Sequence, residues 1–184
     1  GRTGNGSTTD RAGLCQHHPM TFKSHPAALP DGLAALPDGV RPARPADYDR
    51  IAPLLDAWWG RPILEALPRL FLDHFHTTSL IAEHPDGALR GFLIGFVSPS
   101  RPTEAYIHFV GIAPSERGSG LGRLLYETFF DAARTAGRTE VSAVTSPVNT
   151  PSIAFHTAMG FAASPAVAGY NGPGHDLVTF RRRL

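Results

Sequence analysis

The sequence has little of what marks a secreted, membrane-bound or nucleic-acid-binding protein. Its single cysteine, Cys15, excludes a disulfide within the chain, and no apolar run reaches the ~18 residues that a membrane-spanning helix needs. The formal net charge of +1 gives no general attraction to nucleic acid. The first ten residues are polar and glycine-rich, unlike a secretory signal. These absences predict a cytoplasmic protein with no membrane partner and no nucleic-acid partner.

Proline and glycine are unevenly distributed along the chain. Four prolines and two copies of the motif ALPDG fall near its beginning, which predicts a flexible Pro/Gly-rich N-terminal extension over residues 1–38. The folded domain is expected over residues 39–184. A chain of 184 residues with 42% hydrophobic residues is long enough to bury one core, so we expect a single domain.

Beyond residue 39, strand-like and helix-like periodicities follow one another. They predict an edge strand at 40–44, helices at 48–59 and 62–76, strands at 77–84, 88–98 and 103–114, a helix at 122–136, a strand at 139–147, a helix at 152–159, and one or two strands in the tail. Asp47 is expected to cap the first helix, Pro68 to break the second, and Leu124 to face inward. The order predicts an α/β (α+β) fold with helices on the faces of a mixed sheet.

The stretch RGSGLG, residues 117–122, lies between a predicted strand and a predicted helix. Glycines at a helix N-terminus let backbone N–H groups approach an anion. A P-loop is excluded, because Arg123 and Leu124 stand where Lys and Ser or Thr are needed. A dinucleotide fingerprint has a different glycine spacing and belongs in the first strand–helix unit, although Glu140 keeps a weak version of it open. A helix-entry turn without a ligand is also open.

The same stretch resembles the Q/R-x-x-G-x-G/A pyrophosphate loop of the GNAT superfamily of acyl-CoA-dependent N-acyltransferases. The downstream segment NTPSIAFHTAMGF, residues 149–161, resembles the family's second motif, and the element order matches over residues 40–184. The resemblance implies a single-domain, mostly antiparallel sheet that splays between its fourth and fifth strands. It also implies acetyl-CoA as cosubstrate, no metal, and direct transfer to a primary amine.

The resemblance assigns the pantetheine arm to the splayed strand and the pyrophosphate to the glycine loop. The residues that it implies for acetyl-CoA are Val110, Gly111, Ile112, Arg117, Gly118, Ser119, Gly120, Leu121, Gly122, Arg123, Asn149 and Ser152. Arg117 is equally suited to shaping the loop, and Asn149 to capping the helix that follows it.

Acetyl transfer to an amine needs a base for the ammonium and an acid for the leaving thiolate. The family usually places a tyrosine as that acid, seven residues after the asparagine, and this chain has His156 there. His156 is therefore the candidate acid, although a structural role paired to a backbone group in its helix is also open. Relatives often hold a glutamate near the position of His108, which makes His108 the candidate base. Glu104 is a further candidate, expected near the solvated start of its strand. Cys15 lies outside the predicted domain, so a cysteine acyl-enzyme is not expected.

In this family the first helices and the C-terminal hairpin line the acceptor site. The candidates here are Trp58, Tyr106, Tyr170 and Asp176. Trp59 and Gly60–Arg61, which follow Trp58, are also offered as lining residues, with one of the two tryptophans expected in the core. The acceptor is expected to be a small-molecule or peptide amine, and a homodimer is left open. Two alternatives from other classes are a non-catalytic sensor that binds CoA or acyl-CoA and a dinucleotide-binding oxidoreductase.

Overall fold

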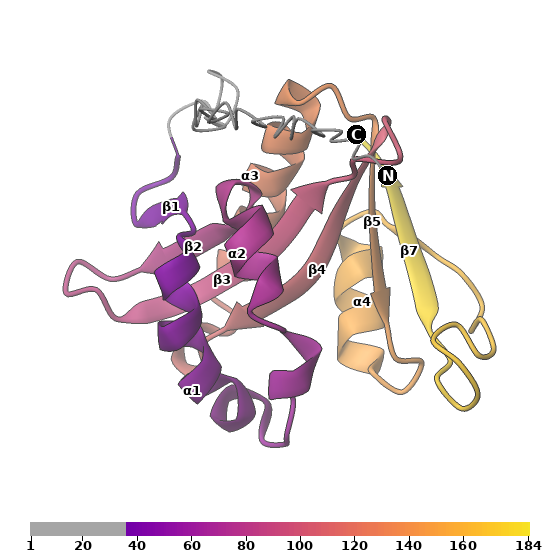
Figure 1. Cartoon of the computed structure of the whole chain (residues 1–184), viewed down its shortest axis with the longest axis horizontal. Coiled ribbons are helices and arrows are strands. Elements are labelled where there is room, and N and C mark those ends of the chain that lie inside the picture. The colour runs from indigo at the N-terminus through magenta and orange to yellow at the C-terminus, as the bar shows by residue number, and fades with distance from the viewer. Residues whose placement is uncertain (1–35) are drawn as a thin grey trace, which may run out of the picture.

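Alternate residues of the central strands face opposite sides of one sheet, and each side is covered by helices (Figure 1). The computed structural model describes residues 36–184, so most of the predicted extension, including Cys15, lies outside the described residues. The strands are β1 (Val40–Pro42), β2 (Leu80–Glu83), β3 (Leu89–Val97), β4 (Glu104–Ile112), β5 (Glu140–Thr145), β6 (Ala162–Ala163) and β7 (Val178–Arg183). The helices are α1 (Tyr48–Trp59), α2 (Leu70–Phe75), α3 (Leu121–Thr135) and α4 (Thr150–Ala158).

The sheet has the order β1-β2-β3-β4-β5-β7-β6, and β4–β5 is its parallel pair. The other pairs of strands are antiparallel. The mixed, mostly antiparallel sheet is therefore confirmed, with β1 at one edge as predicted. Pro68 falls between the short 3-10 helix Leu64–Ala66 and α2, which confirms the break expected there.

Two hydrophobic clusters form the core, one on each face of the sheet. On one face, Phe92 and Ile94 of β3 pack with Ile51 and Leu55 of α1. On the other face, Leu93 of β3 belongs to a larger cluster with buried residues of α3, β4, β5 and β7. Among residues 36–184, no helix combines the length and apolar character needed to cross a membrane.

Helix α3 differs in one respect from its predicted packing. Leu124 is 36% exposed, whereas Tyr126 and Phe130 are buried. The buried stripe runs through Leu121, Leu125 and Phe129 and widens toward Tyr126 and Phe130, because α4 and β7 also cover this helix. Leu124 lies outside that stripe, so the expectation that it faces inward is wrong.

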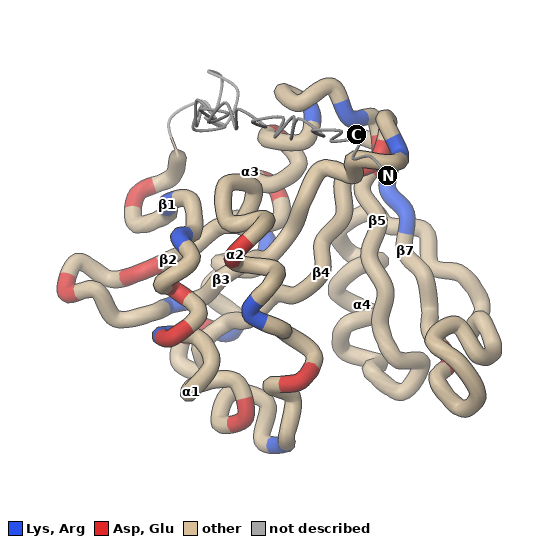
Figure 2. The backbone as a smooth tube through the Cα atoms, in the orientation of Figure 1, with Lys and Arg blue, Asp and Glu red and all other residues tan. Residues whose placement is uncertain are grey.

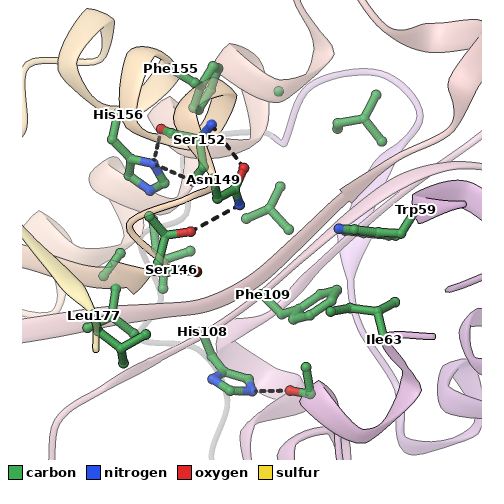
Figure 3. Close-up of a pocket in the computed structure, with 18 of the residues that line it drawn as sticks. Trp59, Ile63, His108, Phe109, Ser146, Asn149, Ser152, Phe155, His156 and Leu177 are labelled. Atoms are coloured by element: carbon green, nitrogen blue, oxygen red, sulfur yellow. Dashed lines mark hydrogen bonds between the residues drawn. The ribbon is translucent and has the colours of Figure 1, made fainter. Parts of the chain in front are cut away.

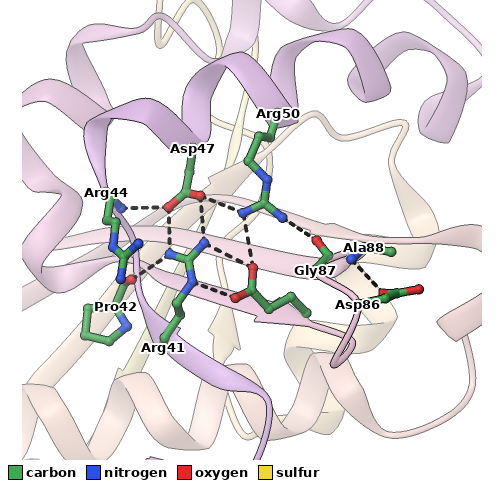
Figure 4. A network of polar contacts seen from close by, with 9 residues as sticks. Arg41, Pro42, Arg44, Asp47, Arg50, Asp86, Gly87 and Ala88 are labelled. Carbon is green, nitrogen blue, oxygen red and sulfur yellow. Dashed lines mark hydrogen bonds and ion pairs between the residues drawn. The ribbon is translucent and has the colours of Figure 1, made fainter.

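Asp47 precedes α1 as predicted, but its carboxylate makes no capping bond to that helix. It accepts a bond from the Arg44 N–H at 2.8 Å and two from the Arg41 guanidinium, each 2.8 Å long (Figure 4). Arg50 and Glu83 complete the cluster. Burial alone would raise the pKa of Asp47, but these hydrogen bonds outweigh it and hold the pKa below its usual value. Asp47 thus ties β1 to the start of α1.

Glu104 is also placed differently from the expectation. Its side chain is buried at the start of β4 and pairs with Arg101 at 3.0 Å. Glu104 is opposite Glu140 in the short parallel pairing with β5, where the Glu140 N–H donates to the Thr103 carbonyl oxygen at 3.1 Å. Glu104 is therefore not solvated, and it lies at the closed end of the β4–β5 junction.

Candidate active site

A cleft opens where β4 and β5 separate. The two strands pair only at Glu104–Glu140, Ala105–Val141 and Tyr106–Ser142. Beyond these three pairs lies a cavity of about 480 Å³ between β4 and the α1–α2 segment on one side and β5, α4 and the loop before β7 on the other. A second cavity of about 390 Å³ adjoins it at the glycine loop.

The backbone of β4 faces this gap. The Ala113 N–H donates to the Arg90 carbonyl oxygen of β3 at 2.9 Å. Because backbone polar groups alternate direction along an antiparallel strand, those of Val110 and Ile112 point away from β3, toward the gap. With β5 diverging there, these groups are available to a bound molecule.

The glycine loop ends in the N-terminus of α3. Gly118 and Gly120 have φ of +79° and +89°, a left-handed conformation that favours glycine. Within the described part of the chain, the N–H groups of Gly118, Gly120, Gly122 and Arg123 have no hydrogen-bond partner. These amides and the positive end of the α3 dipole suit an anion.

A β-bulge in β4 decides which side chains reach the cleft. Ile94 pairs with Phe109 and Gly95 pairs with Ile107, so His108 is the extra residue. Without the bulge, adjacent side chains would face opposite sides of the sheet. With it, His108 and Phe109 both face the α1–α2 side.

The His108 ring is fixed by two contacts. It stacks on Phe71 of α2 with 3.7 Å between ring centroids, and its Nε2 donates to the Ala66 carbonyl oxygen at 2.9 Å (Figure 3). Nδ1 has no hydrogen-bond partner among the described residues. Burial lowers the pKa of His108, with the bond to Ala66 opposing the shift. The ring is therefore neutral near pH 7, with the lone pair of Nδ1 available.

His156 lies on the other side of the cleft, in α4, and both of its ring nitrogens are engaged. Nδ1 donates to the Ser152 carbonyl oxygen at 2.8 Å, so Nε2 accepts from the Tyr126 hydroxyl at 3.0 Å. The ring stacks on Phe180 with 4.1 Å between centroids. Burial lowers the pKa of His156 and raises that of Tyr126. This geometry holds a neutral imidazole against a protonated phenol.

Asn149 connects the end of β5 to α4. Its Nδ2 donates to Thr145 Oγ1 at 3.0 Å, and its Oδ1 accepts from the Ser152 N–H at 3.4 Å (Figure 3). Asn149 therefore caps α4, one of the two roles expected for it, and it also lines the cleft.

Most of the described chain matches a known family. The family model described as the acetyltransferase (GNAT) family matches residues 47–161. The chain belongs to the GNAT family.

Individual proteins similar to this GNAT chain are also named as acetyltransferases. An L-2,4-diaminobutyric acid acetyltransferase from Nocardia farcinica is 34% identical over 90 residues, which are 49% of this chain and 46% of that relative. The match thus spans about half of the curated relative's length. A GNAT-family protein from Desulfovibrio desulfuricans has a TM-score of 0.67 at 20% identity, covering 78% of this chain and 97% of that one. YncA from Salmonella typhimurium, whose structure was solved with acetyl-CoA, has a TM-score of 0.60 at 21% sequence identity. That match covers 79% of this chain and 92% of YncA. These two structures show the GNAT fold.

Most residues predicted for acetyl-CoA line the two cavities of the GNAT cleft. The main cavity is lined by Val110, Ile112, Gly122, Asn149 and Ser152. The adjoining cavity is lined by Ile112, Arg117, Gly118, Gly120, Leu121, Gly122 and Arg123. Arg117 also donates to the Trp58 carbonyl oxygen, which ties the loop to α1.

Gly111 and Ser119 are the two exceptions. Gly111 faces α1, where a Cβ would lie 2.5 Å from the Phe92 ring, so glycine is required there by packing. The Ser119 hydroxyl donates to the Glu116 carbonyl oxygen at 2.7 Å and accepts from the Leu121 N–H. Ser119 therefore shapes the loop and does not line either cavity.

The structure does not bring the residues predicted for the acceptor to the cavity. They are Trp58, Tyr106, Tyr170 and Asp176. Trp58 stacks on Phe92 in the core, and Tyr106 stacks on Phe96. Asp176 accepts the Gly169 N–H at 2.8 Å and thereby closes its own loop. Tyr170 is half-exposed in that loop.

Trp59 and Arg61, which the sequence also offered, do line the cavity, together with residues that it did not offer. Trp59 does so, with its ring tilted against Phe109 at 5.1 Å between centroids, because α1 turns Trp58 into the core. Tyr126, Arg61 and Asn171 also line it. A tyrosine one turn into the helix after the glycine loop was the available signal for Tyr126, whereas Asn171 gave none. Among residues 36–184, no three His, Cys, Asp or Glu residues gather as a metal site would need.

Proposed function

We propose that this GNAT protein transfers the acetyl group of acetyl-CoA directly to a primary amine in a ternary complex. One observation carries the proposal. The gap between β4 and β5 connects the free amides of the glycine loop to the free Nδ1 of His108. An anion-binding loop and a neutral base therefore open on the same space.

The donor side of the cleft fits CoA. The amides of Gly118, Gly120, Gly122 and Arg123 suit a pyrophosphate, and their left-handed glycines allow its close approach. The peptide groups of β4 that face the gap suit the amide-containing pantetheine arm. The N–H of Val110 is the candidate for stabilising negative charge on the thioester oxygen. Bound acetyl-CoA would supply an activated acetyl group.

We assign the base to His108. An ammonium is not nucleophilic, so a proton must leave the amine before attack. Nδ1 of His108 holds a free lone pair, and burial keeps the ring neutral. The bond from Nε2 to Ala66 and the stacking on Phe71 fix the ring in that tautomer. His108 can therefore accept the proton directly or through one water.

On the leaving-group side, we assign the proton donor to Tyr126 and a positioning role to His156. Neither nitrogen of His156 is free to reach a thiolate. Tyr126 lines the cavity, and the proposal requires its hydroxyl to turn from Nε2 to a departing sulfur. The sequence predicted His156 as the acid. Under this assignment its hydrogen-bond partner Tyr126 is the acid, and His156 holds the Tyr126 hydroxyl in place.

The acceptor is proposed to be a small amine. The Nocardia relative is named for L-2,4-diaminobutyric acid, which makes that compound the first acceptor to test. A peptide amine, a homodimer and a cytoplasmic location stay predictions.

The test is release of free CoA thiol from acetyl-CoA over a panel of small amines, with a thermal-shift measurement on the same protein. We expect stabilisation by acetyl-CoA and CoA, but not by NAD, together with amine-dependent thiol release. Stabilisation without release on any amine would favour the sensor alternative. Stabilisation by NAD alone would remove the proposal altogether.

A further inference from the structure

The main cavity carries an unusual balance of charge. Of the described residues that line it, Arg61 is the only one with a formal charge near pH 7. The two histidines in the lining are neutral because burial lowers their pKa values. No carboxylate within residues 36–184 lines the space, so no negative side chain there pairs with an acceptor's ammonium group.

The neutral side of the cleft accounts for this balance. Between Val141 and Phe180, which covers β5 after its first residue Glu140, α4 and the loop before β7, Asp176 is the single Asp, Glu, Lys or Arg. That carboxylate is occupied by the Gly169 N–H and does not line the cavity. Figure 2 shows α4 and these loops almost without charge, whereas charges are frequent around α1 and α2.

Arg61 stands on a fixed backbone but has no partner for its guanidinium. Gly60 ends α1 in a left-handed conformation with φ of +66°. The Asp56 carboxylate then accepts the N–H groups of Ile63 and Leu64 at 2.8 and 3.1 Å. Within residues 36–184, the Arg61 side chain makes no ion pair or hydrogen bond. Eight other guanidinium groups pair with a carboxylate, whereas the exposed Arg183, like Arg61, has no such pair within these residues; what distinguishes Arg61 is its place in the cavity lining. The eight are Arg41, Arg50, Arg69, Arg90, Arg101, Arg123, Arg134 and Arg181.

The same segment also orients the base. Five residues after Arg61, the Ala66 carbonyl oxygen accepts the proton of His108 Nε2. One short stretch between α1 and α2 therefore places a free guanidinium and a fixed imidazole on the same cavity. A guanidinium binds a carboxylate through two parallel hydrogen bonds, and a nearby cation also lowers the pKa of an amine.

We infer that Arg61 binds a carboxylate of the acceptor. The substrate is then a free amino acid whose side-chain amine or α-amine lies at His108. This rests on the proposed function and narrows it to amines that carry a free carboxylate. Peptide amines without a nearby carboxylate and simple diamines are poor acceptors under this inference.

The test compares amino acids with the diamines that they become on losing the carboxylate. The pairs are diaminobutyric acid with trimethylenediamine, ornithine with putrescine, and lysine with cadaverine. Each is assayed for kcat and KM with saturating acetyl-CoA in wild type, R61Q and R61K. Arg183→Gln is the matched control, because Arg183 is an exposed arginine at the end of β7 outside the cavity lining.

For the best pair, wild type is expected to prefer the amino acid by about 10- to 100-fold in kcat/KM, the range of a charged hydrogen-bonded contact. R61Q should bring that ratio near one by raising KM for the amino acid. R61K should keep part of the preference, and the control should keep all of it. An unchanged ratio in R61Q, or a preference for diamines in wild type, would overturn the inference. So would a rise in KM for acetyl-CoA alone, which would assign Arg61 to the donor.

A binding measurement separates this inference from the proposed function. Calorimetry of the CoA-saturated protein with the same compounds needs no turnover. Tighter binding of an amino acid than of its diamine in wild type, lost in R61Q, supports the inference even if no thiol is released. Equal binding of both members of every pair overturns it, whatever the assay of turnover shows.

Discussion

The β4–β5 cleft and the charge cluster beside β1 differ in whether their polar groups have hydrogen-bond partners within the protein. In the cluster, Arg41, Asp47, Arg50 and Glu83 satisfy one another at 2.8–3.1 Å (Figure 4). In the cleft, backbone amides, one imidazole nitrogen and one guanidinium lack partners within the described chain. The glycine-loop residues and Arg61 are largely exposed, so their polar groups are open to solvent or to a ligand, whereas those of the cluster are already paired. We therefore expect changes in the cleft to affect catalysis and changes in the cluster to affect stability.

His108→Gln tests the cleft side most directly. Loss of the base should lower kcat by ~10²- to 10⁴-fold, the range of general acid–base catalysis. Steady-state kinetics measure this fall, and thermal unfolding should show little change. His74→Gln is the control, because His74 is an exposed histidine of α2 outside the cavity. Full turnover by the His108 variant would remove the base assignment.

Arg41→Met tests the cluster. The change leaves the buried Asp47 carboxylate without its two-pronged partner, at a cost of about 1–3 kcal/mol in the free energy of unfolding. Denaturant unfolding should show that loss, while kcat per folded molecule stays at the wild-type value. A variant with normal stability, or with impaired kcat when folded, would contradict the separation of the two regions.

Gly120→Ala sharpens the comparison within one helix. Alanine at φ of +89° should destabilise the fold by about 1–2 kcal/mol and also raise KM for acetyl-CoA, because the loop amides shift. Gly137→Ala is the matched control, since Gly137 has φ of +74° near the other end of α3 and open space around it. The Gly137→Ala variant should lose a similar amount of folding free energy while its KM for acetyl-CoA stays unchanged. Equal effects on KM would mean that the loop is not the donor site.

Tyr126→Phe tests the leaving-group side. Removal of the hydroxyl should lower kcat by roughly 10- to 100-fold, toward the lower end for a general acid. It should leave KM for acetyl-CoA nearly unchanged. His156→Asn should produce a smaller fall if His156 only positions Tyr126. A larger fall for the histidine variant, in kcat assays at several pH values, would return the acid role to His156.

The smallest expected effect is a difference in pH dependence between the two regions, with kcat/KM reporting on the cleft and stability at low pH reporting on the cluster. His108 has a pKa below 6.5, so kcat/KM should fall only as the pH drops below that value and the base is protonated. Stability should also begin to fall there, because the unfolded chain then binds protons that the buried histidines do not. The cluster's contribution is fully present above pH ~5 and is lost at lower pH, since the pKa values of Asp47 and Glu83 are held below their usual values. An activity loss that coincides with unfolding would contradict this order.

The sequence was sufficient for features that depend on neighbours in the chain. The order of elements, the glycine loop and the break at Pro68 follow from local periodicity and turn chemistry. The charge cluster was not predictable in this way, because Asp47 and Glu83 meet only when β1 pairs with β2. Its formation diverts Asp47 from the capping bond that its position suggested.

The catalytic cleft was predicted only in part for the same reason. The β-bulge that makes His108 an extra residue exists only in the pairing of β3 with β4. The choice of Trp59 over Trp58 depends on which face of α1 meets the sheet. The loop before β7 contributes Asn171 through its path in space, which no periodicity encodes.

The short β4–β5 junction has a mechanical consequence. Three residue pairs hold the two halves of the sheet together at one end, and the gap begins immediately beyond them. Beyond that end the two halves are joined by side chains of the shared core rather than by backbone hydrogen bonds. A molecule lying in the gap would contact β4 and β5 at once and so join the parts of the two strands that leave each other unpaired.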